Sequence, residues 1–239
     1  MVNNQSKRHS RRFSCVLWVV LLLVPLLLTG CGDTEPRGSA SSEQAGSAVQ
    51  ETVVSFPYSL EDGKLEITSL FQYSGMNPDC GDEMAENIAS IAVTNHSDQH
   101  LTQARFAVER SDGAELSFLV EDVPAGQTVW AFALDNSSCE LSDTYESIDC
   151  QASFEAASPL LADRLTIAVE ETAVTLTNIS GEALNDLNVH CHCLFDGVYF
   201  GGKTYTYPAD SIPAGGSAVI QAEDCYLGEA AVVRITSGR

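Results

Sequence analysis

The chain has 239 residues, of which 33 are acidic and 12 basic, and its formal net charge is −21 at pH 7. A protein this acidic repels phosphate backbones, so we expect no nucleic-acid partner. The sequence has no G-x-S-x-G elbow, no H-E-x-x-H motif and no Walker loop, and no serine or cysteine is paired with a histidine by spacing. We therefore expect no enzyme.

The first 30 residues have the layout of an export signal. Lys7, Arg8, Arg11 and Arg12 form a basic start without an acidic residue, and an apolar run of about 14 residues follows, from 15 to 28. A helix that spans a bilayer needs about 20 apolar residues, so this run is short for a permanent anchor. The sequence thus predicts that the rest of the chain lies outside the cytoplasm.

The apolar run ends in Leu28-Thr29-Gly30-Cys31. This ending resembles the lipobox of bacterial lipoproteins. The resemblance implies that a signal peptidase removes residues 1–30, that Cys31 carries a diacylglyceryl thioether, and that the protein is lipid-anchored to the cell membrane on its extracytoplasmic side. Two acyl chains suffice for stable attachment. The alternative is an uncleaved anchor helix with an incidental cysteine.

Residues 31–55 are rich in Gly, Ser, Ala and charged residues. Such a segment buries too little apolar surface to fold, so it predicts a flexible tether. Without the four basic residues of the signal, the net charge moves from −21 to −25. The 209 residues from Cys31 onwards suit one large or two small domains.

The chain contains an internal repeat. The segment 91–101 matches 174–184 in the pattern apolar-x-apolar-T-N-x-S-x-x-x-L, and the segment 123–128 matches 212–217 around Pro-Ala-Gly. An Asp-Gly turn lies between these matches in each copy, and the second copy has six extra residues, most of them after that turn. Tandem copies of one small domain explain this pattern. We place them at 56–157 and 158–239.

Both copies predict only strands. Period-2 alternation of Val, Ile, Thr and aromatic residues, broken by turn residues about every ten positions, indicates short antiparallel strands. Strands are expected at roughly 64–73, 88–95, 103–110, 114–121, 127–135 and 145–154, and then at 164–169, 172–178, 185–195, 198–207, 217–224 and 229–236. The fold class is therefore all-β, with two tandem immunoglobulin-like β-sandwich domains after a signal peptide and a flexible tether.

A strand that ends in T-N-x-S, a strand that runs to D-G and a strand that opens after P-A-G resemble the small β-sandwich modules of Gram-positive lipoproteins, including the FxLYD-type domains. The aromatic signature motif of that family is not present in this sequence. The resemblance implies an extracytoplasmic interaction or accessory module.

Six cysteines follow Cys31, an even number that predicts disulfides in an exported protein. They are Cys80, Cys139, Cys150, Cys191, Cys193 and Cys225. If successive strands are antiparallel, Cys80 and Cys139 share one end of the first domain, and Cys193 and Cys225 share the corresponding end of the second. Cys150 and Cys191 would then either link the domains or show that this scheme is wrong. Cys139–Cys150 is a local rival.

Three groups of residues are candidate ligand sites. Asp79, Asp82 and Glu83 lie close together in one loop and could bind Ca²⁺, although their spacing matches no EF-hand. Their alternative role is that of a solvated acidic loop.

The tetrapeptide 190–193 reads H-C-H-C. A strand points successive side chains to opposite faces, so all four groups cannot bind one ion. Cys191 and Cys193 share the parity of Leu187 and Val189 and face the core. His190 and His192 then face outward, either simply exposed or holding Zn²⁺ or Cu²⁺ with a third ligand from elsewhere.

Tyr199, Tyr205 and Tyr207 lie in or beside the extra residues of the second copy. They are candidates for a binding patch, because tyrosine combines apolar area with a polar tip; the alternative is an ordinary packed hairpin. We expect a binding, interaction or structural module whose ligand is an unknown protein or glycan. The alternative is a metal-binding accessory lipoprotein. No cofactor is expected otherwise.

Overall fold

The computed structural model describes residues 53–81, 84–156 and 160–237. They contain fourteen strands and three short 3-10 helices, and no α-helix occurs in these ranges. The prediction of an all-β fold is confirmed. Residues 49–239 belong to one compact unit. The predicted signal, Cys31 and the tether up to residue 52 lie outside the described residues, and no described helix is long and apolar enough to cross a membrane.

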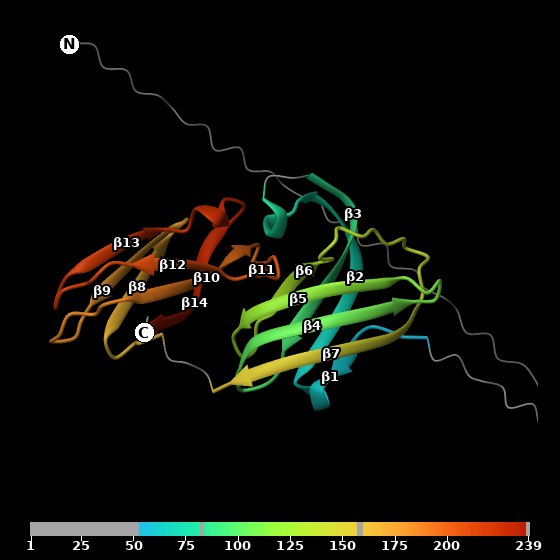
Figure 1. Ribbon diagram of the computed structural model, residues 1–239, viewed down its shortest axis with the longest axis horizontal. Coiled ribbons are helices and arrows are strands. Elements are labelled where there is room, and N and C mark those ends of the chain that lie inside the picture. Colours follow the sequence, from blue (N-terminus) through green and yellow to red (C-terminus); the bar gives the residue numbers. More distant parts are fainter. Residues whose placement is uncertain (1–52, 82–83, 157–159, 238–239) are drawn as a thin grey trace, which may run out of the picture. The chain divides into compact units, whose positions relative to one another are not determined.

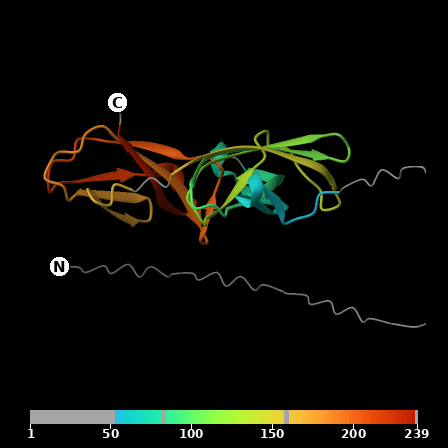
Figure 2. The same cartoon turned by 90° about the horizontal axis from the view of Figure 1, so that it is seen from below.

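The first repeat consists of two sheets (Figure 1). In one, β2 (Leu65–Met76) and β6 (Thr128–Phe132) flank β3 (Met84–Asn95), and the short β1 (Tyr58–Leu60) pairs with β2. In the other, β5 (Glu115–Val123) and β7 (Tyr145–Glu155) flank β4 (His100–Arg110). Figure 2 shows the two layers from below, with the green β4 and β5 above the cyan β1 and β2.

The core of the first repeat lies between these sheets because alternate residues of each strand are apolar. Leu101, Phe106 and Val108 of β4 face Ile91 and Val93 of β3 in one buried cluster. The segment before β1 closes this core: Val54, from the end of the predicted tether, donates its N–H to the carbonyl of Tyr145 at 2.8 Å and packs on the cluster.

The second repeat has the same plan. One sheet has the order β13 (Ser217–Gln221), β9 (Ala173–Asn178), β8 (Leu165–Glu170). In the other, β12 (Tyr205–Ala209) and β14 (Glu229–Ser237) flank β10 (Leu187–Phe195). Their core, with Leu176, Val189 and Ile212, is a cluster separate from that of the first repeat.

The register is the same in both repeats. Thr94 pairs with Thr128 in the first, and Thr177 pairs with Ser217 in the second, at the sequence offsets found for the repeat. The strands lie within a few residues of their predicted positions. Two details were not predicted: the strand β1, and the division of the expected strand 198–207 into β11 (Val198–Phe200) and β12.

Two glycines divide that strand. Gly201 has φ +100°, and a Cβ on Gly202 would lie 1.9 Å from the carbonyl oxygen of Leu119, so no other residue fits there. The chain can therefore leave β11, cross the end of β5 and return as β12. β11 pairs antiparallel with β10 and parallel with β6 of the first repeat, through Tyr199–Val129 and Phe200–Trp130. The insertion of the second repeat thus extends the β1–β2–β3–β6 sheet into the second repeat.

Candidate functional site

Many of the residues singled out from the sequence lie where the two repeats meet. We call this region the joint; it consists of Asn77–Gly81, Glu121 and Asp122 of the first repeat and His190, His192 and Gly201–Tyr205 of the second. It also receives Arg234 of β14. The sequence did not indicate that these candidates would share one location.

Asp79 binds the insertion of the second repeat. Its carboxylate accepts the N–H of Gly202 at 2.8 Å and of Lys203 at 3.2 Å, and its carbonyl accepts the Lys203 ammonium at 2.6 Å. Burial raises the pKa of this carboxyl, while the two backbone donors act in the opposite direction. Asp79 therefore has a structural role, because it holds the insertion of the second repeat against the first repeat. The two other residues of the predicted calcium site, Asp82 and Glu83, lie outside the described residues.

The three candidate tyrosines are packed. Tyr205 donates its hydroxyl to the carbonyl of Pro78 at 2.5 Å, and Tyr207 donates to the carboxylate of Asp224 at 2.7 Å. Tyr199 stacks on the ring of His192, with centroids 5.1 Å apart. Burial raises the pKa of all three phenols. The structure therefore favours the packed hairpin over a free tyrosine patch.

The two histidines of β10 face away from the core that contains Cys191 and Cys193, as the alternation predicted. That face is not open to solvent, however: His192 is 0% exposed because the first repeat covers it. Its Nε2 lies 2.6 Å from the carbonyl of Glu121, and Nδ1 has no hydrogen-bond partner among the described residues. Burial lowers the pKa of His192 to about 4, so the ring is neutral at pH 7.

Asp122 is the centre of a charged cluster in the joint. Its carboxylate lies 3.0 Å from Nε2 of His100 and 3.2 Å from the guanidinium of Arg234, and His190 lies 3.9 Å away. Burial acts to raise the pKa of Asp122, but these partners together hold it below the usual range. Burial lowers the pKa of His190, against the opposite effect of Asp122. The joint is thus closed by a buried acid that contacts one arginine and two histidines.

Among the described residues, no group of three or more His, Cys, Asp or Glu side chains is placed to hold a metal ion. His190 instead lies 3.1 Å from the hydroxyls of Thr206 and Thr236. The described part of the chain therefore gives no support to the Ca²⁺ or Zn²⁺/Cu²⁺ alternatives.

All six cysteines are free thiols in the structure. Cys193 and Cys225 interact directly through their side chains in the second core, and burial raises the pKa of the neighbouring Cys191 thiol to about 12. In the first repeat, Cys139 is buried and interacts with Tyr145, whereas Cys80 lies beside Asn136.

Cys150 packs against the first core and Cys191 belongs to the second, so the structure does not bring this leftover pair together. Of the predicted pairs, Cys193–Cys225 is the one whose side chains interact within one core. The disulfide assignments remain predictions.

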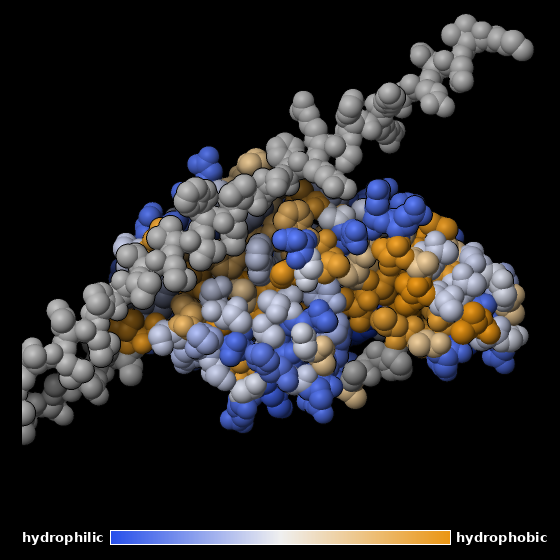
Figure 3. Space-filling view, turned by 180° about the vertical axis from the view of Figure 1, so that it is seen from behind, coloured by the Kyte–Doolittle hydropathy of each residue, from blue (hydrophilic) through white to orange (hydrophobic). Residues whose placement is uncertain are grey.

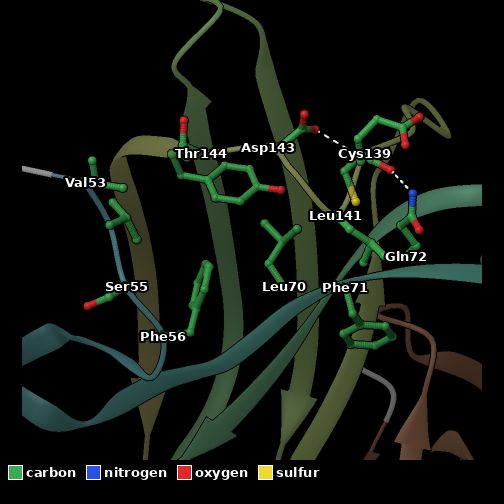
Figure 4. A pocket seen from close by; sticks show the side chains of 13 residues that line it. Val53, Ser55, Phe56, Leu70, Phe71, Gln72, Cys139, Leu141, Asp143 and Thr144 are labelled. Carbon is green, nitrogen blue, oxygen red and sulfur yellow. Dashed lines mark hydrogen bonds between the residues drawn. The ribbon is translucent and has the colours of Figure 1, made fainter. Parts of the chain in front are cut away.

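The candidate ligand site is a pocket of about 280 Å³ in the first repeat (Figure 4). The segment 53–56 forms one wall, residues 70–72 of β2 form the floor, and the loop 139–145 forms the other wall. Val53 is 57% exposed and Leu141 is 90% exposed, so apolar side chains stand in solvent at the rim. No sequence motif indicates this pocket, because its walls come from segments about 85 residues apart in the chain, 53–56 and 139–145.

Hydrogen bonds fix the pocket walls. The amide of Gln72 donates to the carbonyl of Cys139, and the N–H of Glu140 donates to the carboxylate of Asp143 at 2.8 Å. Arg110 also binds Asp143 at 3.3 Å. The loop that carries Leu141 is thereby tied to β2 and β4, so the exposed leucine projects from a supported loop.

No known protein family matches this sequence, and a search of curated proteins finds no match to it either.

Proposed function

We propose that the protein is a lipid-anchored lipoprotein of the extracytoplasmic membrane face that acts as a binding module. The order of basic start, apolar run and Cys31 supports the anchor. The joint supports the binding role, because backbone pairing and buried polar contacts connect the two repeats into a stiff body that can present a surface at a distance from the membrane.

The observation that carries the binding role is the pocket with Leu141 and Val53 at its rim. Leu141 is 90% exposed on a loop that hydrogen bonds support, and it does not belong to the buried cluster of the first repeat. Exposed apolar residues around a concave site are typical of interaction sites. Figure 3 shows in addition that hydrophobic residues gather on the rear face, on the side of the second repeat, away from this pocket.

The pocket favours a protein ligand over a glycan. Its volume of about 280 Å³ is at the small end for ligand pockets, and its lining includes Val53, Phe56 and Leu70. Such a site takes one apolar side chain of a partner. We therefore propose that the ligand is an extracytoplasmic protein.

Crosslinking in living cells tests this proposal. A photoreactive amino acid at position 141 is expected to crosslink a discrete partner, and the same amino acid at the exposed position 195, far along the chain in β10, is not. An additional Phe56→Asp substitution places a charge in the pocket wall and should abolish the crosslink. A crosslink that persists in this variant would contradict binding in the pocket.

A further inference from the structure

The two repeats differ in whether the equivalent strands β6 and β13 are paired on both edges. β6 of the first repeat pairs with β3 on one side and with β11 on the other. Its counterpart β13 pairs with β9, and no second described strand pairs with it. Figure 1 shows β13 at the outer border of the second repeat. The position that β11 occupies in the first repeat is open in the second.

The register identifies which atoms lie at this open edge. Trp130 of β6 pairs with Ala92 as Val219 of β13 pairs with Thr175. The carbonyl of Trp130 accepts the N–H of Gly201 at 2.9 Å, so the backbone groups of Trp130 point towards β11. The same register points the backbone groups of Val219 towards the open edge. Its side chain is 62% exposed, whereas that of Trp130 is partly buried against Phe200.

The edge of β13 also lacks the usual protection. Open strand edges normally carry charged residues or proline that prevent pairing with other chains. β7 has several acidic residues and β8 ends in Glu170, whereas β13 reads S-A-V-I-Q. β6, whose edge is covered by β11, is equally uncharged.

Glu121, which binds the Gly202–Thr204 segment in the joint, also has a counterpart in the second repeat. In the first repeat, Glu121 donates its N–H to the carbonyl of Gly202 at 2.9 Å, and its carboxylate accepts the N–H of Thr204 at 3.3 Å. Asp210 is the counterpart of Glu121, as the shared pairing of Leu101–Val123 and Leu184–Ile212 shows. The residues around it, 185–188 and 208–211, line an open pocket of about 430 Å³.

We propose that the β13 edge and this pocket form a strand-docking site for a second protein, which binds as β11 binds the first repeat. The partner contributes an extended strand that pairs parallel to β13, with an apolar side chain against Val219, followed by two small residues that cross towards Asp210. This inference rests on the proposed binding function and names a second binding surface for it.

The charges of the pocket define the partner further. It is lined by Asp186 and Asp210 and by no basic residue. In the joint, Lys203 follows the glycine pair and binds Asp79. The docking strand is therefore apolar, then glycine-rich, then basic. A second copy of this chain does not supply it: its β11 is engaged with β6, and its first repeat has a tight turn at Arg110–Ala114 in place of the insertion.

A labelled peptide with the sequence of residues 196–207 is the probe, because it carries the natural docking strand. Binding to the full mature chain is measured by fluorescence anisotropy, and the protected amides are located by hydrogen exchange. We expect saturable binding with protection of 217–221. Val219→Lys should weaken binding by about tenfold or more, since it charges an edge that must pair. Asp210→Lys should weaken it as well, and Val169→Lys on the opposite edge strand β8 should not.

Several results would overturn the inference. The first is the absence of saturable binding up to about 1 mM peptide. The second is protection of residues 128–132 alone, because the peptide would then only replace β11. The third is unchanged peptide binding by a Val219→Lys variant whose melting temperature is that of the wild type. Self-association that Val219→Lys abolishes would assign the edge to a second copy and would likewise overturn it. Each of these results leaves the Leu141 crosslink and the lipid anchor standing, so the failure of this inference is distinguishable from that of the proposed function.

Discussion

Asn95 and Asn178 lie 83 positions apart and make the same hydrogen bonds. The amide of Asn95 donates to the carbonyls of Gln99 and Val123, and that of Asn178 donates to Glu182 and Ile212, all at 2.7–2.9 Å. Both asparagines are 0% exposed and accept the N–H of the serine two residues later. The T-N-x-S pattern thus encodes a buried clamp between two strand ends at both positions.

Replacing either clamp residue should destabilise its repeat. Asn95→Ala and Asn178→Ala each leave two carbonyls without their amide donor, at a cost of about 2–3 kcal/mol of unfolding free energy. Urea unfolding measures this cost. Gln221→Ala, on an exposed side chain of β13, is the control and should change stability by less than about 0.5 kcal/mol. Equal stabilities of Asn178→Ala and the control would contradict the role of the clamp.

The joint depends on Gly202. Gly202→Ala places a Cβ against the carbonyl of Leu119 and should separate β11 from β6, with a loss of about 2 kcal/mol or more. Gly181→Ala is the matched control, because a Cβ at that position meets no atom within 4 Å. Hydrogen exchange of residues 128–132 should become faster in Gly202→Ala only. Unchanged protection of β6 would show that β11 does not cover it.

The joint should weaken in acid because of His192. Its pKa falls from 6.5 in the unfolded chain to about 4 in the folded protein, so the neutral form favours folding. This stabilisation is complete above pH 6.5 and is lost as the pH falls towards 4, by about 3 kcal/mol in total. Unfolding free energies between pH 7 and 4 should show this decline in wild type and in the exposed-site control His96→Gln. His192→Gln should flatten the curve, and a decline of the same size in that variant would refute the assignment.

Cys193 and Cys225 should form a disulfide in the exported protein, because their thiols already interact in the second core. The bridged protein would be lighter by two hydrogens, and Cys193→Ala and Cys225→Ala should each cost about 2–5 kcal/mol. The double variant should cost no more than either single one. Cys150→Ala serves as the comparison. A cost for the double variant that equals the sum of both single costs would exclude the bridge.

Much of the fold can be predicted from the local alternation of apolar and polar residues along the chain. Alternation of apolar residues located β2–β10, β13 and β14 to within a few residues, and it placed Cys191 and Cys193 inside with His190 and His192 on the opposite face. Alternation shows to which face of the sheet a side chain points, but it does not show what covers that face. His192 was therefore expected to be exposed, whereas the first repeat buries it.

The site was harder to predict from the sequence, because sequence patterns do not show which distant segments come into contact. Asp79, Tyr199 and Tyr205 were chosen for their chemistry, and all three have structural roles: Asp79 and Tyr205 belong to the joint, and Tyr199 stacks on His192 of the joint. The Gly201-Gly202 pair was the available signal, since two glycines inside an expected strand indicate a break in it. Nothing local, however, indicates that β11 pairs with β6, about 70 residues earlier in the chain. Asp122 and Arg234 were missed because their roles depend on contacts with residues far away in the sequence.

The most direct test of the account is the intact mass of the mature protein recovered from membranes, compared with that of Cys31→Ser. We predict a chain that begins at Cys31, carries a diacylglyceryl group on that cysteine and fractionates with membranes, whereas Cys31→Ser should not be processed in this way. A mature chain without lipid on Cys31, released freely into the medium, would contradict the claim that this protein is a membrane-anchored binding module.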